Sequence, residues 1–369
     1  MCDGKNGFEK TKHRYPYEWT LKDANFTKDK GTVFSCFACG GGSTMGYKLA
    51  GFDVLGCNEI DPKMIEAYKA NHNPKYAYLE PIQTFKLRTD LPDELYNLDI
   101  LDGSPPCSSF SMAGNREKDW GKDKVFREGQ AMQVLDTLFF DFIDLAKKLQ
   151  PKVVIAENVK GLLLGEAKQY VIQIYKEFEK AGYNVQHWLL DASKMGVPQK
   201  RERVFFIALR NDLCEPFMHQ KDLFTTAPKL ELEFKEPEIN FEKINDSLDS
   251  SIEQKKAGRV ALWNICKKGE QFSKYHPKGH YFADYKLNYT DIVPTITASV
   301  GDGAWHPDFC RLLNRKELCR AGTYPQDYDF KGNEEQYLIG MSVPPVMVAQ
   351  IATEVLTQWL CKSQKRGDF

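Results

Sequence analysis

Residues 31–51, "GTVFSCFACGGGSTMGYKLAG", indicate the fold of the first half of the chain. A β-branched and aromatic run predicts a strand, glycines follow it directly, and helix-forming residues follow the glycines. The same alternation of short apolar runs with helical patterns continues to about residue 210. Such alternation is typical of βαβ units, so the sequence predicts an α/β protein with a doubly wound, mostly parallel sheet.

Four unusual segments each follow a predicted strand. They are the glycine loop, Glu59, the Pro-Pro-Cys run at 105–107 and Glu157. Because ligands of doubly wound sheets bind at the carboxyl ends of the strands, we expect these segments to meet in one crevice.

Composition places the 369-residue chain among ordinary soluble proteins, with a net charge of −1. No apolar run approaches the ~20 residues of a membrane span, and the N-terminal stretch lacks the apolar region of a signal peptide. We therefore expect no membrane partner and a cytoplasmic location, with the ten cysteines as reduced thiols. Cys36 and Cys39 form a CxxC pair without a second pair at zinc-finger spacing, so we expect no metal site.

The alternation fails between about 211 and 300, where proline, charge and aromatic residues take over. We predict a catalytic and cofactor-binding domain over 1–210 that is completed by 325–369. A target-recognition domain over 211–310 and a hinge over 311–334 would separate these parts. Within the second region, 253–289 is basic and interleaved with aromatic residues and histidines, which suits nucleic acid as well as it suits a solvated basic face.

The glycine loop and Glu59 favour a ligand that contains adenosine. Glycines let the backbone approach a ligand closely, and an acid after the next strand can bind a ribose hydroxyl. The loop lacks both the dinucleotide pattern GxGxxG and the Gly-Lys-Ser/Thr of a phosphate-binding loop. Tight helix packing is the alternative explanation.

Three further positions carry candidate chemistry. Cys107, at a strand end before a helix, is either an activated nucleophile or a small buried residue. Glu157 ends the buried run "KVVIA" and is either a proton donor or a helix cap. Arg201 and Arg203 in "QKRERVFF" are expected on one strand face, suited to phosphate or carbonyl groups, although edge-strand charges have the same pattern.

Together, these motifs resemble the S-adenosylmethionine-dependent DNA (cytosine-5)-methyltransferases of the restriction-modification type. "FACGGG" is similar to the opening loop of that family, "NEID" to its ribose-binding acid, "GSPPCSSFS" to its nucleophile motif and "ENV" to its second catalytic motif. "QKRER", "RLLNRKELCRAGTYPQDY" and "IGMSVPP" match the later motifs in order. The resemblance spans about 32 to 360, apart from 211 to about 300, where the family carries its variable recognition region.

The resemblance implies a mechanism and a set of residues. Cys107 would add to C6 of a cytosine flipped out of double-stranded DNA, Glu157 would protonate N3, and Arg201 and Arg203 would hold the base carbonyl and a phosphate. The segment 111–130 resembles the mobile loop that closes over the base. The cofactor, S-adenosyl-L-methionine, would contact Phe37, Gly41, Gly42, Glu59, Ile60, Glu80, Pro106, Leu138, Ser342 and Val343.

Three positions depart from the family pattern. Cys39 replaces the first glycine of the opening loop, and a shift to Gly40 would compensate for it. Glu80 stands where an aspartate usually contacts the adenine amino group. Met341 stands where an asparagine usually supports the catalytic loop.

The alternatives are a tRNA cytosine-5 methyltransferase, a non-catalytic nucleic-acid-binding module and a nicotinamide dehydrogenase. The Cys-Phe-Thr triplet expected of the tRNA branch is absent. Intact Cys107, Glu157 and Arg203 argue against the binding module, and a dehydrogenase leaves the Pro-Pro-Cys and "ENV" motifs unexplained. We expect a monomer with a cognate restriction endonuclease as a possible partner at the same DNA site.

Overall fold

The computed structural model describes residues 13–106, 123–124, 133–134, 137–165, 167–220, 226–251 and 257–361. Cys107 lies outside these residues. So does the predicted mobile loop, apart from the short strand β5 (Asp123–Lys124), which pairs with β6 (Gln133–Val134).

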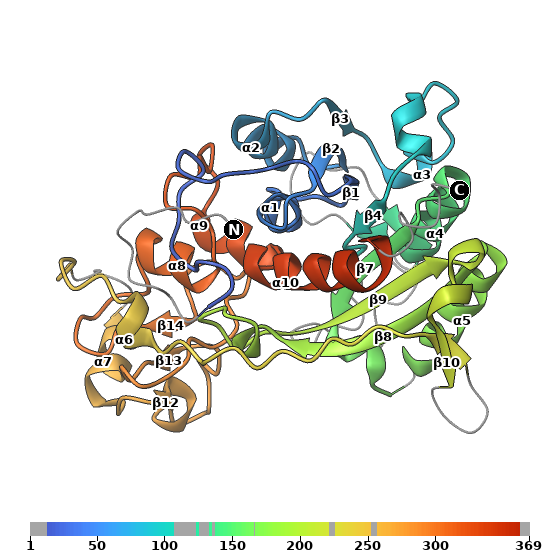
Figure 1. Cartoon of the computed structure of the whole chain (residues 1–369). Helices are drawn as coiled ribbons and strands as arrows, with labels where there is room; N and C mark the ends of the chain where they lie inside the picture. Colours follow the sequence, from blue (N-terminus) through green and yellow to red (C-terminus); the bar gives the residue numbers. More distant parts are fainter. Residues whose placement is uncertain are drawn as a thin grey trace.

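A seven-stranded sheet forms the centre of the described structure (Figure 1), with the strand order β3-β2-β1-β4-β7-β9-β8. Its strands are β1 (Thr32–Cys36), β2 (Asp53–Glu59), β3 (Tyr76–Leu79), β4 (Ile100–Gly103), β7 (Val153–Val159), β8 (Tyr183–Asp191) and β9 (Glu202–Arg210). The first five strands in this spatial order pair in parallel, whereas β9 runs antiparallel to both of its neighbours. The predicted doubly wound, mostly parallel sheet is confirmed, and the reversed β9 is its one antiparallel insertion.

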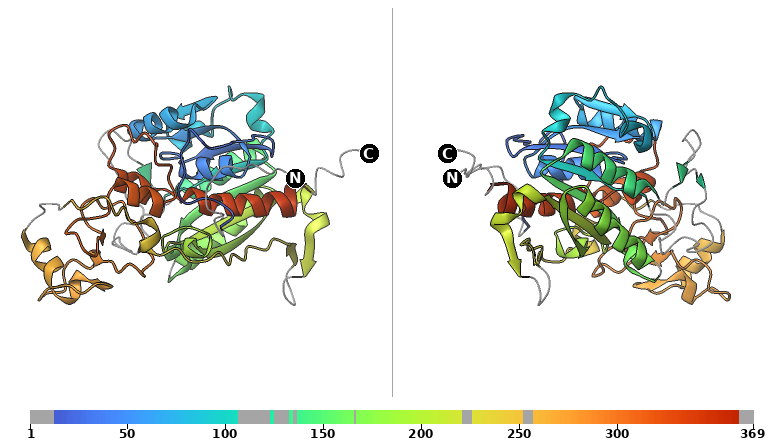
Figure 2. Two further views of the ribbon diagram at one scale, coloured as in Figure 1. Left: turned by 60° about the vertical axis from the view of Figure 1, so that its left-hand side comes forward. Right: turned by 90° about the vertical axis from the view of Figure 1, so that its right-hand side faces the viewer.

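Helices cover both faces of the sheet (Figures 1 and 2). The helices of the catalytic part are α1 (Gly42–Leu49), α2 (Pro62–His72), α3 (Ile82–Phe85), α4 (Leu138–Leu149), α5 (Ala167–Lys180), α9 (Glu335–Met341) and α10 (Pro345–Val355). Successive strand residues alternate between the two faces. Phe34, Leu101 and Val154 join the apolar cluster that includes α3, α4 and α5, whereas Val33 and Ile100 join the cluster that includes α1 and α10.

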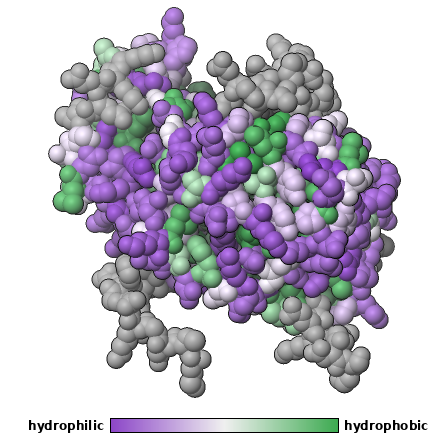
Figure 3. All heavy atoms as spheres, turned by 90° about the horizontal axis from the view of Figure 1, so that it is seen from above, coloured by the Kyte–Doolittle hydropathy of each residue, from purple (hydrophilic) through white to green (hydrophobic). Residues whose placement is uncertain are grey.

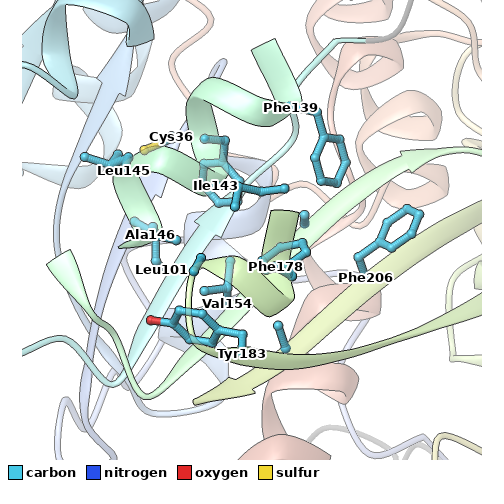
Figure 4. Packing of buried hydrophobic residues seen from close by; sticks show 14 of the residues in the cluster. Cys36, Leu101, Phe139, Ile143, Leu145, Ala146, Val154, Phe178, Tyr183 and Phe206 are labelled. Atoms are coloured by element: carbon cyan, nitrogen blue, oxygen red, sulfur yellow. The ribbon is translucent and has the colours of Figure 1, made fainter. Parts of the chain in front are cut away.

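Aromatic rings fill the first of these clusters. Phe139 of α4 meets Phe206 of β9 edge to face, with 5.4 Å between ring centroids, and Phe178 of α5 contacts Tyr183 (Figure 4). Burying rings of this size supplies much of the hydrophobic stabilisation that fixes the helices on the sheet.

Helix α10 returns the C-terminal part of the chain to the sheet. The helical run Glu335–Leu360 is long and apolar enough to cross a membrane, so the expectation that no such run exists is wrong. In the structure, 83% of its most apolar window is buried inside the fold, as in the core helix of a soluble protein. Figure 1 shows α10 lying across one face of the sheet beside α1.

The predicted domain boundary at residue 211 falls inside a segment, 211–239, that packs against the catalytic part. Cys214, Phe217, Leu230 and Leu232 belong to the apolar cluster of the α10 face. This part includes β10 (Met218–Gln220) and β11 (Thr226–Pro228). The segment therefore extends the catalytic part, because its apolar side chains are satisfied by that core.

A small region with its own core follows. It contains α7 (Ala257–Ile265), β12 (Glu270–Gln271), β13 (Tyr285–Lys286) and β14 (Ala304–Trp305), and α8 (Arg315–Ala321) comes after it. The short helix α6 (Phe241–Ile244) precedes it and packs in the cluster that includes α1 and α2. Phe272 and Trp305 are fully buried in the apolar cluster of the small region. Figure 2 shows this region extending from one end of the sheet. The predicted hinge, 311–334, packs instead in a cluster that Tyr324 and Tyr328 share with α1 and α2.

The segment before β1 packs against this last cluster, and Trp19 is a buried member of it. Trp19 donates a hydrogen bond from Nε1 to the carbonyl of Thr323 at 2.9 Å, and Glu18 forms an ion pair with Arg320. The N-terminal extension, which lies outside the sequence motifs, thus fixes the segment that precedes α9. The face of the molecule shown in Figure 3 is largely hydrophilic with scattered apolar side chains.

The contact between α1 and α10 depends on a glycine. A Cβ at Gly46 would lie 2.5 Å from the carbonyl oxygen of Pro345 and 2.6 Å from Cβ of Val348. We expect Gly46→Ala to lower the free energy of unfolding by about 1–3 kcal/mol because the two helices must separate. Urea unfolding followed by circular dichroism measures this loss. Gly258→Ala in α7, where the nearest atom is 3.8 Å away, is the matched control, and an equal effect of both changes would contradict the close packing.

Candidate active site

The pairing of β7 with β9 places the catalytic candidates. Val159, at the carboxyl end of β7, stands opposite Arg203, near the start of the antiparallel strand β9. Since β9 is reversed, its beginning lies at the edge where the parallel strands end. The motif "QKRER" therefore reaches the same edge as "ENV", although the two motifs are about 40 residues apart.

Glu157 and Arg203 form an ion pair at this edge. The distance between Nε of Arg203 and Oε1 of Glu157 is 2.9 Å, and the two side chains are 15% and 13% exposed, respectively. Burial lowers the pKa of Arg203, and the charge of Glu157 opposes this effect. The pair places an oriented carboxyl group in a largely desolvated position, where charge interactions are stronger than in water.

The strand that carries Glu157 also holds the Pro-Pro segment. Asn158 donates a hydrogen bond from Nδ2 to the carbonyl of Pro105 at 3.1 Å. Pro105 and Pro106 lead directly to Cys107, which lies outside the described residues. The chain therefore approaches Cys107 from a position that is tied to the residue next to Glu157.

Arg201 and Arg203, which the sequence predicts on one strand face, have different hydrogen-bond partners. Arg201 precedes β9, and its guanidinium donates to the backbone carbonyls of Ile296, Gly340 and Ser342. Its side chain is buried, whereas Arg203 turns to Glu157. Arg203 lies within β9 and Arg201 directly precedes it, and burial together with the charge of Arg203 lowers the pKa of Arg201.

The glycine loop adopts left-handed backbone conformations at alternate residues. The φ angles of Phe37, Cys39 and Gly41 are 53°, 49° and 87°. Cys39 itself thus holds the left-handed conformation, whereas Gly40 allows a close approach, since a Cβ there would lie 2.6 Å from the Tyr328 hydroxyl. A left-handed conformation costs a non-glycine residue roughly 1 kcal/mol, so the loop carries a small strain at this departure from the family pattern.

Glu59 anchors the loop from the end of β2. Its Oε2 accepts a hydrogen bond from the backbone N–H of Cys39 at 2.7 Å, and its Oε1 accepts from those of Ile60 and Asp61. Burial raises the pKa of Glu59, and the three hydrogen bonds oppose this effect. The carboxyl group therefore joins the ends of β1 and β2.

A pocket opens beside Glu59. It is lined by Phe37, Cys39, Glu59, Ile60, Asp61, Met64, Ser104, Pro106, Tyr337 and Met341. Four predicted cofactor residues, Phe37, Glu59, Ile60 and Pro106, thus come together there. Cys39 and Met341, two of the departures from the family pattern, also line it, and burial raises the pKa of the Cys39 thiol to about 12. That thiol is therefore un-ionised at neutral pH.

The other predicted cofactor residues are not among those that line the pocket. Gly42 allows the closing motif to approach, since a Cβ there would lie 2.6 Å from the carbonyl oxygen of Val343. Ser342 accepts a hydrogen bond from Tyr324 and donates one to the carbonyl of Leu338. Gly41 begins the turn into α1.

Two predicted residues have other contacts. Leu138 is fully buried in the core cluster with α4. The Glu80 carboxylate forms an ion pair with Arg88 at 2.9 Å and accepts a hydrogen bond from Thr84 at 3.0 Å. Any contact of Glu80 with an adenine would therefore compete with Arg88.

Two side chains that no sequence motif indicates hold the glycine loop. Tyr328 donates a hydrogen bond to the carbonyl of Gly40 at 2.5 Å, and Nε2 of His72 lies 3.1 Å from the same oxygen. Burial and the charge of Lys48 lower the pKa of His72 to about 3, so its ring is neutral and Nε2 is the donor. The glycine loop itself gave no signal for these partners, which come from α2 and from the segment before α9.

Asp102 is a second buried carboxyl that the sequence did not single out. It lies on β4, two residues before Ser104, and accepts hydrogen bonds from Ser35 at 2.7 Å and Tyr47 at 3.0 Å. Burial raises its pKa to about 7, and the charge of Glu157 adds to the shift. The strand that leads to the Pro-Pro segment therefore carries a carboxyl group that titrates near neutrality.

The basic residues predicted as a nucleic-acid surface fall into two groups. Arg259 forms an ion pair with the fully buried Asp284, and Lys286 lies 3.8 Å from the ring centroid of Trp263, so both support the small core. Lys267 and Lys278 are exposed, and so are Lys268 and Lys274, which pair with Asp308 and Glu270. Among the described basic residues of this stretch, the exposed lysines are the ones that face a phosphate backbone.

Comparison with known proteins agrees with this geometry. The family described as "C-5 cytosine-specific DNA methylase" matches residues 31–357. The Type II methyltransferase M.NgoFVII of Neisseria gonorrhoeae is 26% identical over 91% of this chain and 89% of its own length. M.Sau96I of Staphylococcus aureus is 29% identical over 94% of this chain and 81% of its own length. M.FnuDI of Fusobacterium nucleatum is 38% identical over 49% of this chain. The matched part covers 47% of the length of M.FnuDI, about half of that protein.

Solved structures share the fold. A methyltransferase encoded within an E. coli prophage superimposes with a TM-score of 0.64 at 20% identity, over 89% of this chain and 99% of its own. A DNMT2 variant from Spodoptera frugiperda has a TM-score of 0.59 at 19% identity, over 88% and 99%. The chain belongs to the C-5 cytosine-specific DNA methylase family and is a DNA (cytosine-5)-methyltransferase.

Asp102 gives a pH-dependent prediction. Its pKa is higher in the folded protein than in the unfolded chain, so the folded state binds the extra proton between about pH 4 and pH 7 and loses stability as pH rises through that range. The difference between this pKa and the ordinary value corresponds to a change in the free energy of unfolding of at most about 4 kcal/mol. We expect Asp102→Asn to flatten this slope, as measured by urea unfolding at several pH values. Parallel profiles for the two proteins would contradict the assignment.

Proposed function

We propose that the enzyme transfers a methyl group from S-adenosyl-L-methionine to C5 of a cytosine in a specific short sequence of double-stranded DNA. The observation that carries this proposal is the oriented Glu157–Arg203 pair beside the Pro105–Pro106 approach to Cys107. A nucleophile that follows this approach would lie near a proton donor, an arrangement that suits covalent catalysis on a ring.

The residues around the pocket fit this cofactor. Glu59 holds a carboxylate at the end of β2, where a ribose hydroxyl would bind, and Phe37 and Ile60 provide apolar surface for a base. Gly42 lets the closing motif pack against the glycine loop. When bound, S-adenosyl-L-methionine supplies an electrophilic methyl group on a sulfonium sulfur.

The protein's own groups would act on the cytosine. The Cys107 thiolate would form a bond to C6, while Glu157 donates a proton to N3 so that the electron pair is delocalised through the ring and C5 becomes nucleophilic. Arg203 would orient the Glu157 carboxyl and face the base carbonyl. After methylation, loss of the C5 proton and breakage of the sulfur–C6 bond would regenerate Cys107.

The base must leave the helix to reach these groups. A stacked cytosine does not expose C6 to a thiolate in a pocket, so the reaction requires base flipping. The region from about 240 to 310, with exposed Lys267 and Lys278, would contact the duplex. The curated relatives named above are Type II methyltransferases, which supports a restriction-modification role with a cognate endonuclease. We also propose that the enzyme acts as a monomer in the cytoplasm.

Methylation mapping tests the reaction and its substrate. The protein is expressed in a bacterial host that lacks cytosine methylation, and 5-methylcytosine is mapped across the host DNA. We expect one short motif to be methylated throughout. Unmodified DNA, in cells whose soluble protein binds S-adenosyl-L-methionine, would contradict DNA as the substrate, and 5-methylcytosine in tRNA would then favour the RNA alternative.

Two substitutions test the chemical roles. We expect Cys107→Ala to abolish methyl transfer with the cofactor affinity retained, because only the covalent bond to C6 is lost. Glu157→Gln removes the proton donor and keeps the shape, so kcat is expected to fall by about 10²–10⁴-fold. Steady-state kinetics with tritiated cofactor and unmethylated phage DNA give both values. Turnover by Cys107→Ala at more than a trace would refute the adduct.

A further inference from the structure

Arg201 is a buried cation whose partners are backbone carbonyls. Its side chain is 2% exposed. Nη1 donates to the carbonyl of Ile296 at 2.9 Å, and Nη2 donates to those of Gly340 and Ser342 at 2.8 and 2.9 Å. Burial lowers the pKa of Arg201, and the charge of Arg203 lowers it further. A charge in this position is stable only while the carbonyl dipoles remain aligned on it.

These three carbonyls belong to two different parts of the enzyme. Ile296 lies in the predicted target-recognition region, just before the exposed Thr297. Gly340 and Ser342 flank Met341, which lines the pocket beside Glu59. One guanidinium thus connects the recognition region with the wall of the proposed cofactor pocket.

Neighbouring residues add further contacts to this connection. We call the contact of residues 199–201 with 293–298 and 340–342 the seam. Oε1 of Gln199 accepts a hydrogen bond from the backbone N–H of Ile296 at 3.0 Å, and the N–H of Lys200 donates to the carbonyl of Val293 at 2.8 Å. The Thr295 hydroxyl donates to the carbonyl of Lys200 at 2.6 Å. Residues 293–296 are therefore joined to 199–201 by backbone as well as side-chain groups, which leaves little freedom for one to move without the other.

A glycine allows α9, the third segment of this seam, to approach the recognition segment closely. A Cβ at Gly340 would lie 2.5 Å from the carbonyl oxygen of Thr297 and 2.6 Å from the backbone N of Ala298. The backbone of α9 is thus in direct contact with the recognition segment. Figures 1 and 2 show the start of β9 at the end of the sheet from which that region extends.

We propose that Arg201 is a positioning residue that couples cofactor binding to DNA binding, and that it does not contact the flipped base. This inference rests on the proposed function, because it takes DNA as the ligand of the recognition region. The planar fork of arginine carries its donors on separate nitrogens in fixed directions, which suits carbonyls of two chain segments better than the compact ammonium of lysine does. A ligand that fixes either segment therefore fixes the other, and the coupling must be reciprocal.

The test measures how DNA changes cofactor affinity. The probe is S-adenosyl-L-homocysteine, which allows no turnover, and its Kd is measured by calorimetry with and without fragments of unmethylated phage DNA. We expect DNA to tighten binding to the wild-type enzyme at least fivefold. Arg201→Lys, which keeps the charge, and Gly340→Ala, which leaves the arginine in place, should each reduce this tightening to less than twofold.

Arg210→Lys is the matched control, because it makes the same substitution at the far end of β9, where Arg210 pairs with Asp212. It should retain the wild-type coupling. If either seam variant fails to fold by circular dichroism, Thr295→Val takes its place, since that residue is exposed and loses one hydrogen bond.

The outcomes separate the alternatives. If Arg201 contacted a base or phosphate directly, DNA would still tighten S-adenosyl-L-homocysteine binding in Gly340→Ala. That result would overturn the inference. A purely structural role predicts a lower melting temperature with an unchanged ratio of Kd values, which would also overturn it. A wild-type enzyme that methylates no DNA counts against the proposed function, whereas an active one whose seam variants keep the coupling counts against this inference alone.

Discussion

The reversed direction of β9 is the constraint on which the site depends. In a fully parallel sheet, the segment before a strand lies at the edge opposite the ligand crevice. Because β9 is antiparallel to β7, the residues that precede it reach the carboxyl ends of β4 and β7 instead. This single reversal brings Arg203 to Glu157 and Arg201 to the closing motif, so three distant motifs share one edge.

Buried charges at this edge are stabilised in three different ways. Glu157 has a cationic partner, Glu59 has backbone N–H groups, and Arg201 has backbone carbonyls. Charge-assisted hydrogen bonds to fixed backbone groups give direction as well as stability. A substitution at Glu59 or Arg201 would therefore disturb the path of the main chain, whereas one at Glu157 would mainly remove a chemical group.

The sequence was sufficient for the architecture and for the order of the motifs because both depend on local patterns. Strand and helix periodicity gave the sheet, and the acid after β2 and the Pro-Pro segment were found at its edge. Partners distant in sequence were missed. His72 and Tyr328 meet at the carbonyl of Gly40, and Ser35 and Tyr47 meet at Asp102, with no periodic signal to connect them. The different partners of Arg201 and Arg203 depend on tertiary contacts that strand periodicity does not reveal.

The packing of α10 against α1 has a consequence for how the protein is made. The apolar side chains Val33 and Ile100 on that face of the sheet are covered by a helix that ends at Val355. During translation, this face of the sheet therefore stays partly uncovered until α10 has left the ribosome. A growing chain in that state exposes surface that chaperones recognise, and it cannot assemble the wall around Met341. Methylating activity would appear only once synthesis has passed this helix, so that fragments from interrupted translation would remain inactive.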